Sequence, residues 1–284
     1  MRVLVTGGAG YVGSHACKAL SAAGHEPVVY DNLVYGHRDL VRWGPLEEGD
    51  MADRGRLDEV LSAWQPDAAM HFAAYAYVGE SVAEPGKYWA NNVHGTLVLL
   101  EALRAHGIDR LVFSSTCAVY GEPSRVPIPE DHVQWPVNPY GWSKLAAERM
   151  LADFHLAHGL RSVALRYFNA AGADPEAETG EHHEPETHLI PLVLDAALGK
   201  RQEITVFGGD YPTPDGTCIR DYIHVSDLAD AHVIALDWLG ERDAAVAFNL
   251  GNGRGFSVRE VIDCARRITG RPIAVGDGPR RDGD

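Results

Sequence analysis

Short apolar segments alternate with segments of helical periodicity through the first two thirds of the chain. The apolar runs favour Val, Leu and aromatic residues, as buried strands do. Strands are predicted at residues 2–6, 27–30, 68–72, 110–114 and 162–167, and helices at 89–106 and 140–158. Because strands that alternate with helices form parallel sheets, we predict an α/β fold, a Rossmann-type doubly wound parallel sheet with helices on both faces.

The pattern changes after Asn169. Residues 173–187 are rich in Asp, Glu, Pro and His, and shorter elements follow them. We therefore predict a Rossmann domain at residues 1–168 and a smaller mixed α/β lobe at 169–284. A ligand cleft is expected between this lobe and the carboxyl edge of the sheet.

A glycine loop follows the first predicted strand and precedes a helix-forming segment. In that position a glycine cluster is the fingerprint of dinucleotide binding, since it lets the backbone approach a pyrophosphate at a helix N-terminus. Asp31 closes the second predicted strand. A carboxylate there accepts a hydrogen bond from a ribose 2′-hydroxyl and repels a 2′-phosphate, which favours NAD over NADP. The alternatives are an ordinary tight turn and a strand-ending loop acid.

Tyr140 and Lys144 are four residues apart on a predicted helix, so both side chains lie on one face. A nearby cation is expected to lower the pKa of the tyrosine until it can take a proton from a substrate. Such a pair also occurs by chance on many helices. Residues 113–116 end a predicted strand at the same sheet edge, where a hydroxyl could share a substrate oxygen with Tyr140, or could instead cap local backbone.

Overall composition indicates a globular enzyme. The 284 residues are 45% hydrophobic and 23% charged, with a net charge of −15, which argues against nucleic acid or an anionic membrane as a partner. No apolar run is long enough to span a membrane, and a strand starting at residue 2 leaves no room for a signal peptide. The four cysteines are scattered (Cys17, Cys117, Cys218 and Cys264), so a reduced, cytoplasmic protein is expected.

Longer motifs give the chain a family resemblance. It is similar to the extended short-chain dehydrogenases/reductases at residues 6–15, 31–33, 49–50, 71–74, 78–81, 91–93, 114–116, 119–121, 140–144 and 166–169. Within that superfamily it resembles the UDP-glucose (UDP-galactose) 4-epimerases, through residues 210–213, 215–217, 220–225 and 279–284.

The resemblance implies an NAD-dependent isomerase that inverts carbon 4 of a UDP-hexose. The implied catalytic residues are Tyr140, Lys144 and Thr116. The implied NAD contacts, besides Tyr140 and Lys144, are Gly7, Gly10, Tyr11, Val12, Gly13, Asp31, Asn32, Leu33, Val34, Tyr35, Asp50, Met51, Phe72, Ala73, Ala74, Asn91, Ser114 and Phe168. The implied contacts to the UDP-sugar, besides Thr116 and Tyr140, are Asn169, His188, Leu189, Thr205, Val206, Phe207, Arg220, Arg281 and Asp284.

Two alternatives keep the same fold. Nucleotide-sugar 4,6-dehydratases carry Asp-Glu after the active-site threonine, whereas Cys117 follows Thr116 here. A non-catalytic nucleotide-sugar sensor would typically lose the tyrosine or the lysine. The family further implies a homodimer in the cytoplasm.

The chain departs from the family pattern in two places. Some members have a lysine where this sequence has Ala76, after Tyr75, so one cofactor contact is missing or comes from elsewhere. The sequence also ends at Asp284, where relatives are expected to continue for a few dozen residues. The run at 182–188 contains three histidines but matches no helical ligand spacing and is interrupted by Pro185, so no metal site is expected.

Overall fold

A seven-stranded parallel sheet forms the centre of the first lobe in the computed structural model, which describes residues 1–240 and 242–280. The strand order is β10-β6-β5-β4-β1-β2-β3, and every neighbouring pair is parallel. This is the doubly wound Rossmann arrangement, with its switch point beside β1, as the sequence predicted. The strands are β1 (Arg2–Thr6), β2 (Glu26–Asp31), β3 (Leu46–Glu48), β4 (Ala68–His71), β5 (Arg110–Ser114), β6 (Arg161–Tyr167) and β10 (Ala245–Leu250).

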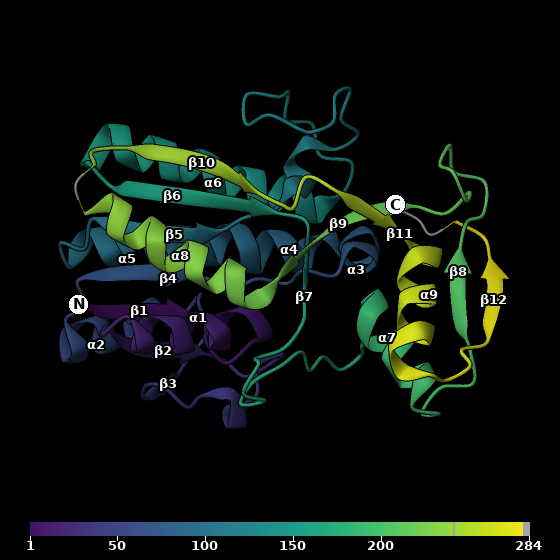
Figure 1. Cartoon of the computed structure of the whole chain (residues 1–284). Coiled ribbons are helices and arrows are strands. Elements are labelled where there is room, and N and C mark those ends of the chain that lie inside the picture. Colours follow the sequence, from purple (N-terminus) through teal and green to yellow (C-terminus); the bar gives the residue numbers. More distant parts are fainter. Residues whose placement is uncertain (241, 281–284) are drawn as a thin grey trace.

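Helices cover both faces of this sheet (Figure 1). One face packs against α2 (Arg54–Trp64), α5 (Gly95–Ala105) and α6 (Pro139–His158), and the other against α1 (Tyr11–Ala22) and α8 (Val225–Leu239). Successive strand residues point to opposite faces. Leu4 accordingly packs in the first core, while Val3 and Val5 pack in the second, and all three are fully buried.

Local signals explain where α6 begins and ends. Asn138 caps its N-terminus by accepting a hydrogen bond from the Gly141 N–H at 2.9 Å, and Pro139 occupies the first turn. Gly159 ends the helix in a left-handed conformation with φ of 74°. The shorter helical segments are α3 (Val78–Ala83), α4 (Pro85–Tyr88), 3₁₀ turns at Arg38–Leu40 and Cys117–Tyr120, and a π-helical turn at Trp89–His94.

The second lobe has a core of its own and lies beyond the carboxyl ends of the sheet's strands (Figure 1). Val193, Ile204 and Ile262 pack in this core. Its elements are α7 (Leu189–Ala197), β8 (Ile204–Phe207), α9 (Val258–Thr269) and β12 (Val275–Gly278). A three-stranded sheet connects the two lobes, formed by β7 (Asn169–Ala171), β9 (Ile219–His224) and β11 (Gly255–Ser257).

The path of the chain is less simple than the expected division at residue 169. Both α8 and β10 come after that residue, yet they belong to the layers of the first lobe. The chain therefore leaves the Rossmann sheet after β6, returns for α8 and β10, and then enters the second lobe again. The sequence reading missed this return because β10 is an edge strand without fully buried residues. Among the described helices, none combines the length and the apolar character needed to cross a membrane.

Candidate active site

The loop between β1 and α1 is shaped by its glycines. Gly7 has φ of 74°, and its N–H donates to the Tyr30 carbonyl at 2.9 Å. A Cβ on Gly7 would lie 2.5 Å from the Ala73 nitrogen, and one on Gly13 would lie 2.2 Å from the Gly7 oxygen. The helix begins at Tyr11 without a side-chain cap, so its first N–H groups suit an anion. This cradle fits the pyrophosphate of a dinucleotide.

Asp31 ties the glycine loop to the segment after β2. Its carboxylate accepts the Ala9 N–H at 3.0 Å and the Leu33 N–H at 2.9 Å. Burial raises the pKa of Asp31, and these two backbone hydrogen bonds oppose that rise. Beside it, Asn32 Nδ2 donates to Asp50 Oδ2 at 2.9 Å. The structure thus joins the predicted ribose and adenine residues at the ends of β2 and β3.

The remaining predicted cofactor residues flank these two. The Phe72 and Ala73 N–H groups donate to the Thr6 carbonyl at 2.8 and 3.1 Å, which holds the segment after β4 against the glycine loop. Met51 is buried, whereas Val34 is exposed. Ala74 follows Ala73 in the same segment, and Tyr35, Asn91 and Ser114 come from the β2–β3 loop, the π-helical turn and the end of β5.

A lysine from another element lies near the position where this chain, with Ala76, lacks the lysine of some family members. Lys87 of α4 places Nζ 4.2 Å from the ring centroid of Tyr75. The same Nζ donates to Tyr35 Oη at 3.0 Å and to Glu80 Oε1 at 2.7 Å. A cation therefore reaches the predicted cofactor residue Tyr35 although position 76 is alanine. Sequence reasoning missed it because no motif marks Lys87.

Lys144 points into the end of β5. Its Nζ donates to the Ser114 carbonyl at 2.8 Å and lies 4.8 Å from the ring centroid of Phe113. Burial lowers the pKa of Lys144 to about 7, and the charge of Glu148 opposes that change. The buried site therefore disfavours the charged form of Lys144, whose ammonium carries a desolvation penalty here.

Tyr140 meets Thr116, as predicted, at the carboxyl edge of the sheet. Burial raises the pKa of the Tyr140 phenol, Tyr167 raises it further, and a hydrogen bond from Thr116 opposes the rise. The prediction that Lys144 lowers the pKa of Tyr140 was wrong for the protein alone, because the net change is a rise. Burial is the largest contribution to the pKa of Tyr140, and the Nζ of Lys144 donates to the Ser114 carbonyl.

Two buried groups that sequence reasoning missed support α6. Asn92 accepts the Tyr75 N–H at 2.9 Å and donates to Ser143 Oγ at 3.0 Å, which fixes the helix next to Lys144. Glu148, one turn after Lys144, pairs with Arg166 at 2.5 Å, their side chains being 9% and 5% exposed. Glu148 could have been recognised from the sequence, because it lies one helical turn after Lys144. Its pairing with Arg166 could not, because Arg166 belongs to a different element.

The predicted substrate residues are spread over the second lobe and the three-stranded sheet of β7, β9 and β11. Asn169 follows Phe168 at the start of β7, and its Nδ2 donates to the Asp221 carbonyl at 3.1 Å. Arg220 lies in β9, one residue before Asp221. His188 and Leu189 start α7, and Thr205, Val206 and Phe207 belong to β8. Arg281 and Asp284 lie outside the described residues.

Comparison with known proteins shows the family of the chain. The family model for the NAD dependent epimerase/dehydratase family matches residues 3–251. The chain belongs to this family. The UDP-glucose 4-epimerase of Rhizobium meliloti (strain 1021) is 58% identical over 282 residues, which cover 99% of this chain and 86% of that protein.

Solved structures of family members show the same fold. The UDP-glucose 4-epimerase from Brucella ovis in complex with NAD has a TM-score of 0.96 at 56% identity, covering 100% of this chain and 87% of that one. The UDP-glucose 4-epimerase from Bifidobacterium longum in complex with NAD⁺ and UDP has a TM-score of 0.96 at 39% identity, covering 100% of this chain and 88% of that one. The predicted fold and the resemblance to UDP-glucose 4-epimerases are confirmed.

Proposed function

We propose that this chain is an NAD-dependent isomerase that interconverts UDP-glucose and UDP-galactose through a 4-keto intermediate. The observation that carries the proposal is the pairing of Tyr140 with Thr116 at the carboxyl edge of a dinucleotide-binding sheet, with Lys144 one helical turn away. The family of UDP-glucose 4-epimerases to which the chain is similar supports the same reaction.

The residues of the first lobe fit NAD. The first-turn N–H groups of α1 would hold the pyrophosphate, Asp31 the adenosine ribose, and Lys144 the nicotinamide ribose. When bound, NAD supplies the acceptor and donor of the hydride at carbon 4. We assign residues 1–168 to NAD binding and 169–284 mainly to the UDP-sugar, with α8 and β10 serving the first lobe.

Tyr140 acts as the base that takes the proton of the sugar 4-hydroxyl, and it later returns a proton to the oxygen on carbon 4 after the 4-keto sugar has turned its other face toward the cofactor. Thr116, as its hydrogen-bond partner, orients that hydroxyl. Because burial raises the pKa of Tyr140, the phenol needs a positive charge nearby to ionise. The cationic nicotinamide ring of bound NAD would supply that charge, and Lys144 would add to it in its protonated form.

The UDP moiety is the fixed point around which the sugar turns. Arg220 has a guanidinium group whose geometry matches a diphosphate. Asn169 lies in the same three-stranded sheet, in β7, whereas Arg220 lies in β9. We assign Arg281 and Asp284 to the same clamp. Binding energy from UDP, remote from carbon 4, lets the sugar itself be held loosely enough to present either face.

A 4,6-dehydratase is disfavoured by the residue after Thr116. Burial raises the pKa of the Cys117 thiol, so this side chain stays neutral and cannot move the protons that dehydration requires. A non-catalytic sensor would not need Tyr140, Lys144 and Thr116 together.

One incubation separates these three functions. The protein is mixed with UDP-galactose, and the products are separated by chromatography and identified by NMR. An epimerase forms UDP-glucose without consuming added NAD, a dehydratase forms a 4-keto-6-deoxy sugar nucleotide, and a sensor forms no product. Absence of UDP-glucose contradicts the proposal.

We also propose a homodimer, as the family resemblance implies, and light scattering of the purified protein tests it. We also assign the protein to the cytoplasm, since the four cysteines are free. Its net charge of −15 disfavours nucleic acid as a partner.

A further inference from the structure

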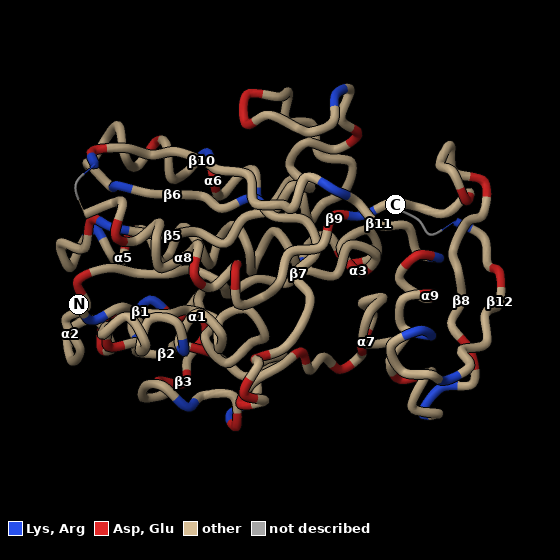
Figure 2. The backbone as a smooth tube through the Cα atoms, in the orientation of Figure 1, with Lys and Arg blue, Asp and Glu red and all other residues tan. Residues whose placement is uncertain are grey.

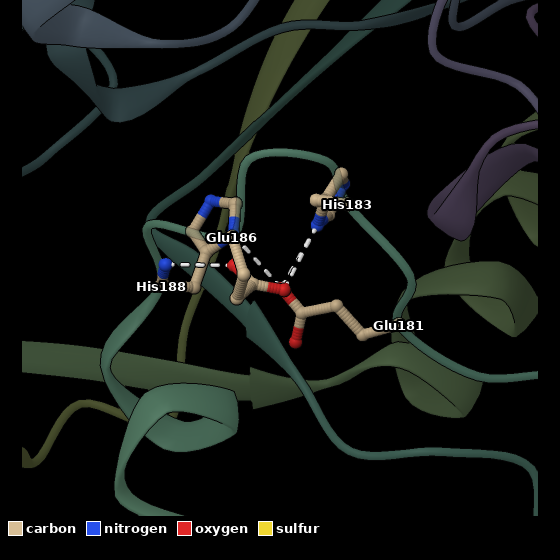
Figure 3. Close-up of side chains that lie close together, drawn as sticks. All are labelled: Glu181, His183, Glu186 and His188. Atoms are coloured by element: carbon tan, nitrogen blue, oxygen red, sulfur yellow. Dashed lines mark hydrogen bonds and ion pairs between the residues drawn. The ribbon is translucent and has the colours of Figure 1, made fainter. Parts of the chain in front are cut away.

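Four side chains between β7 and α7 converge on one point (Figure 3). Glu181, His183, Glu186 and His188 each offer one ligand atom, and these atoms all lie within 4.8 Å of one another. Three of the four side chains are at most 18% exposed. Among these four residues only His188 is also a predicted contact of the UDP-sugar, and the proposed epimerase chemistry gives no role to Glu181, His183 or Glu186.

The spacing of the four ligand atoms is compatible with a metal polyhedron, although His188 also makes a hydrogen bond of 3.0 Å to Glu186. His183 Nδ1 lies 3.4 Å from Glu181 Oε1 and 3.5 Å from Glu186 Oε2, and this buried nitrogen has no hydrogen-bond partner. His188 Nδ1 lies 2.9 and 3.0 Å from the same two carboxylates. In a tetrahedral zinc site, ligand bonds of about 2.0–2.2 Å place the ligand atoms roughly 3.3–3.6 Å apart. The four contacts thus lie within half an ångström or so of that edge length.

Charge gives a second reason for a cation. Two carboxylates meet here, and the stretch at 172–188 contains no lysine or arginine (Figure 2). Neutralising them with protonated histidines would place two cationic rings 4.9 Å apart, centroid to centroid. A divalent ion would instead balance both carboxylates while both imidazoles stay neutral.

A neighbouring cluster shows the contrast. Asp174, Glu176 and Glu178 also converge, but Lys18 Nζ reaches all three, at 2.8, 2.6 and 2.7 Å. That cluster already contains its cation. Within the described residues, the ion pairs of Glu181 and Glu186 are with histidines alone.

We propose that Glu181, His183, Glu186 and His188 form a structural binding site for a divalent transition-metal ion of the zinc class. Two imidazoles and two carboxylates suit Zn²⁺ better than Mg²⁺, which prefers oxygen ligands. Four protein ligands leave no open coordination position, so the site is structural. Backbone N–H groups of Thr187 and His188 each donate to Glu186 Oε1 at 2.8 Å, the outer support that metal-ligating carboxylates need.

The ion would fasten this loop over the cofactor half of the molecule. The His183 ring lies edge-on to Tyr11 at 6.1 Å and to Tyr77 at 6.2 Å, and Tyr77 Oη donates to the Pro185 carbonyl at 3.3 Å. No metal site was predicted from the sequence because the histidines at 182–188 match no helical ligand spacing. The segment is not helical, and Glu181, one ligand, precedes that run.

The test is zinc binding by the full chain, measured apart from activity. Protein stripped with a chelator is titrated with Zn²⁺ in competition with a chromophoric chelator, and retained metal is counted by mass spectrometry after desalting. We expect one zinc per wild-type chain. His183→Ala should bind zinc at least ~100-fold more weakly, since even outer-shell changes cost about 10- to 100-fold.

His182→Ala is the matched control. His182 is the adjacent loop histidine, and it stacks on His37 at 3.9 Å instead of facing the cluster. It should keep wild-type affinity. Glu186→Gln preserves shape and should also lose zinc, which covers the case in which His183→Ala fails to fold. Equal loss in His182→Ala, sub-stoichiometric zinc in the wild type, or Mg²⁺ binding as tight as Zn²⁺ would overturn the proposal.

Discussion

The glycine loop offers a perturbation whose size can be worked out from distances. In Gly13→Ala, the new Cβ would lie 2.2 Å from the Gly7 oxygen and 2.9 Å from both the Gly7 carbonyl carbon and the Gly8 Cα. Ordinary contact begins at 3.4 Å, so the backbone must retreat by about 1 Å. Gly7 has little free space around it, since a Cβ added to it would lie 2.5 Å from the Ala73 nitrogen.

We expect Gly13→Ala to lower the free energy of unfolding by about 2 kcal/mol. Overpacking costs about 1–3 kcal/mol, and the better helix propensity of alanine returns up to about 1 kcal/mol. Because the neighbouring atoms are mostly backbone, which cannot move aside easily, we expect the cost of overpacking to be at the upper end of this range. Displacement of the loop should also weaken NAD binding roughly tenfold or more, one factor of ten for each 1.4 kcal/mol of lost contact.

Gly86→Ala is the matched control for this experiment. Gly86 also lies in the first turn of a helix, α4, but no atom lies within 4 Å of its added Cβ. This variant should be as stable as the wild type or slightly more so. Urea unfolding measures stability, and fluorescence titration of the stripped protein measures NAD affinity. If Gly13→Ala matches Gly86→Ala in both measurements, the account of the loop is refuted.

Two further predictions concern the helix that carries the catalytic pair. Glu148→Gln leaves the buried guanidinium of Arg166 without its ion-pair partner and should lower the free energy of unfolding in urea by about 3–5 kcal/mol. Asp153→Asn, which breaks an exposed pair with Arg149, should lower it by less than ~1 kcal/mol. Equal losses in the two variants would refute the distinction between the buried and the exposed pair. Burial lowers the pKa of Lys144 from 10.5 to about 7, so between these values the unfolded chain binds a proton that the folded chain does not. Lys144 should then make stability rise with pH by up to about 1.4 kcal/mol per unit. From pH 7 to 9 the wild type should therefore gain stability relative to Lys144→Met, and parallel curves would contradict the assignment.

Local patterns predicted the parts of the site that local geometry decides. Tyr140 and Lys144 share a helix face because of their spacing, and Asp31 ends its strand beside the glycine loop because strand, loop and helix follow in order. These features need only a few consecutive residues and the rule that parallel strands end at one edge.

Features that depend on long-range packing were not predictable in this way. The pKa of Tyr140 is governed by burial, which depends on the assembled lobe. Lys87 reaches Tyr35 from a position 52 residues away, and Arg166 reaches Glu148 from the neighbouring strand. The Glu181 cluster forms only when a nonhelical loop folds back. In each case the residues are visible in the sequence, but their closeness in space depends on how the whole chain folds.

The most direct test of the central claim compares two buried phenols. Tyr140→Phe removes the proposed base, and Tyr167→Phe removes the neighbouring hydroxyl, which bonds Ser114 Oγ at 2.6 Å. Conversion of UDP-galactose to UDP-glucose is measured for both, with bound NAD released by denaturation and quantified. Tyr140→Phe should retain NAD and lose turnover by about 10²–10⁴-fold, while Tyr167→Phe should lose less than about tenfold. If Tyr140→Phe keeps more than about a tenth of wild-type kcat, Tyr140 is not the base and the account is contradicted.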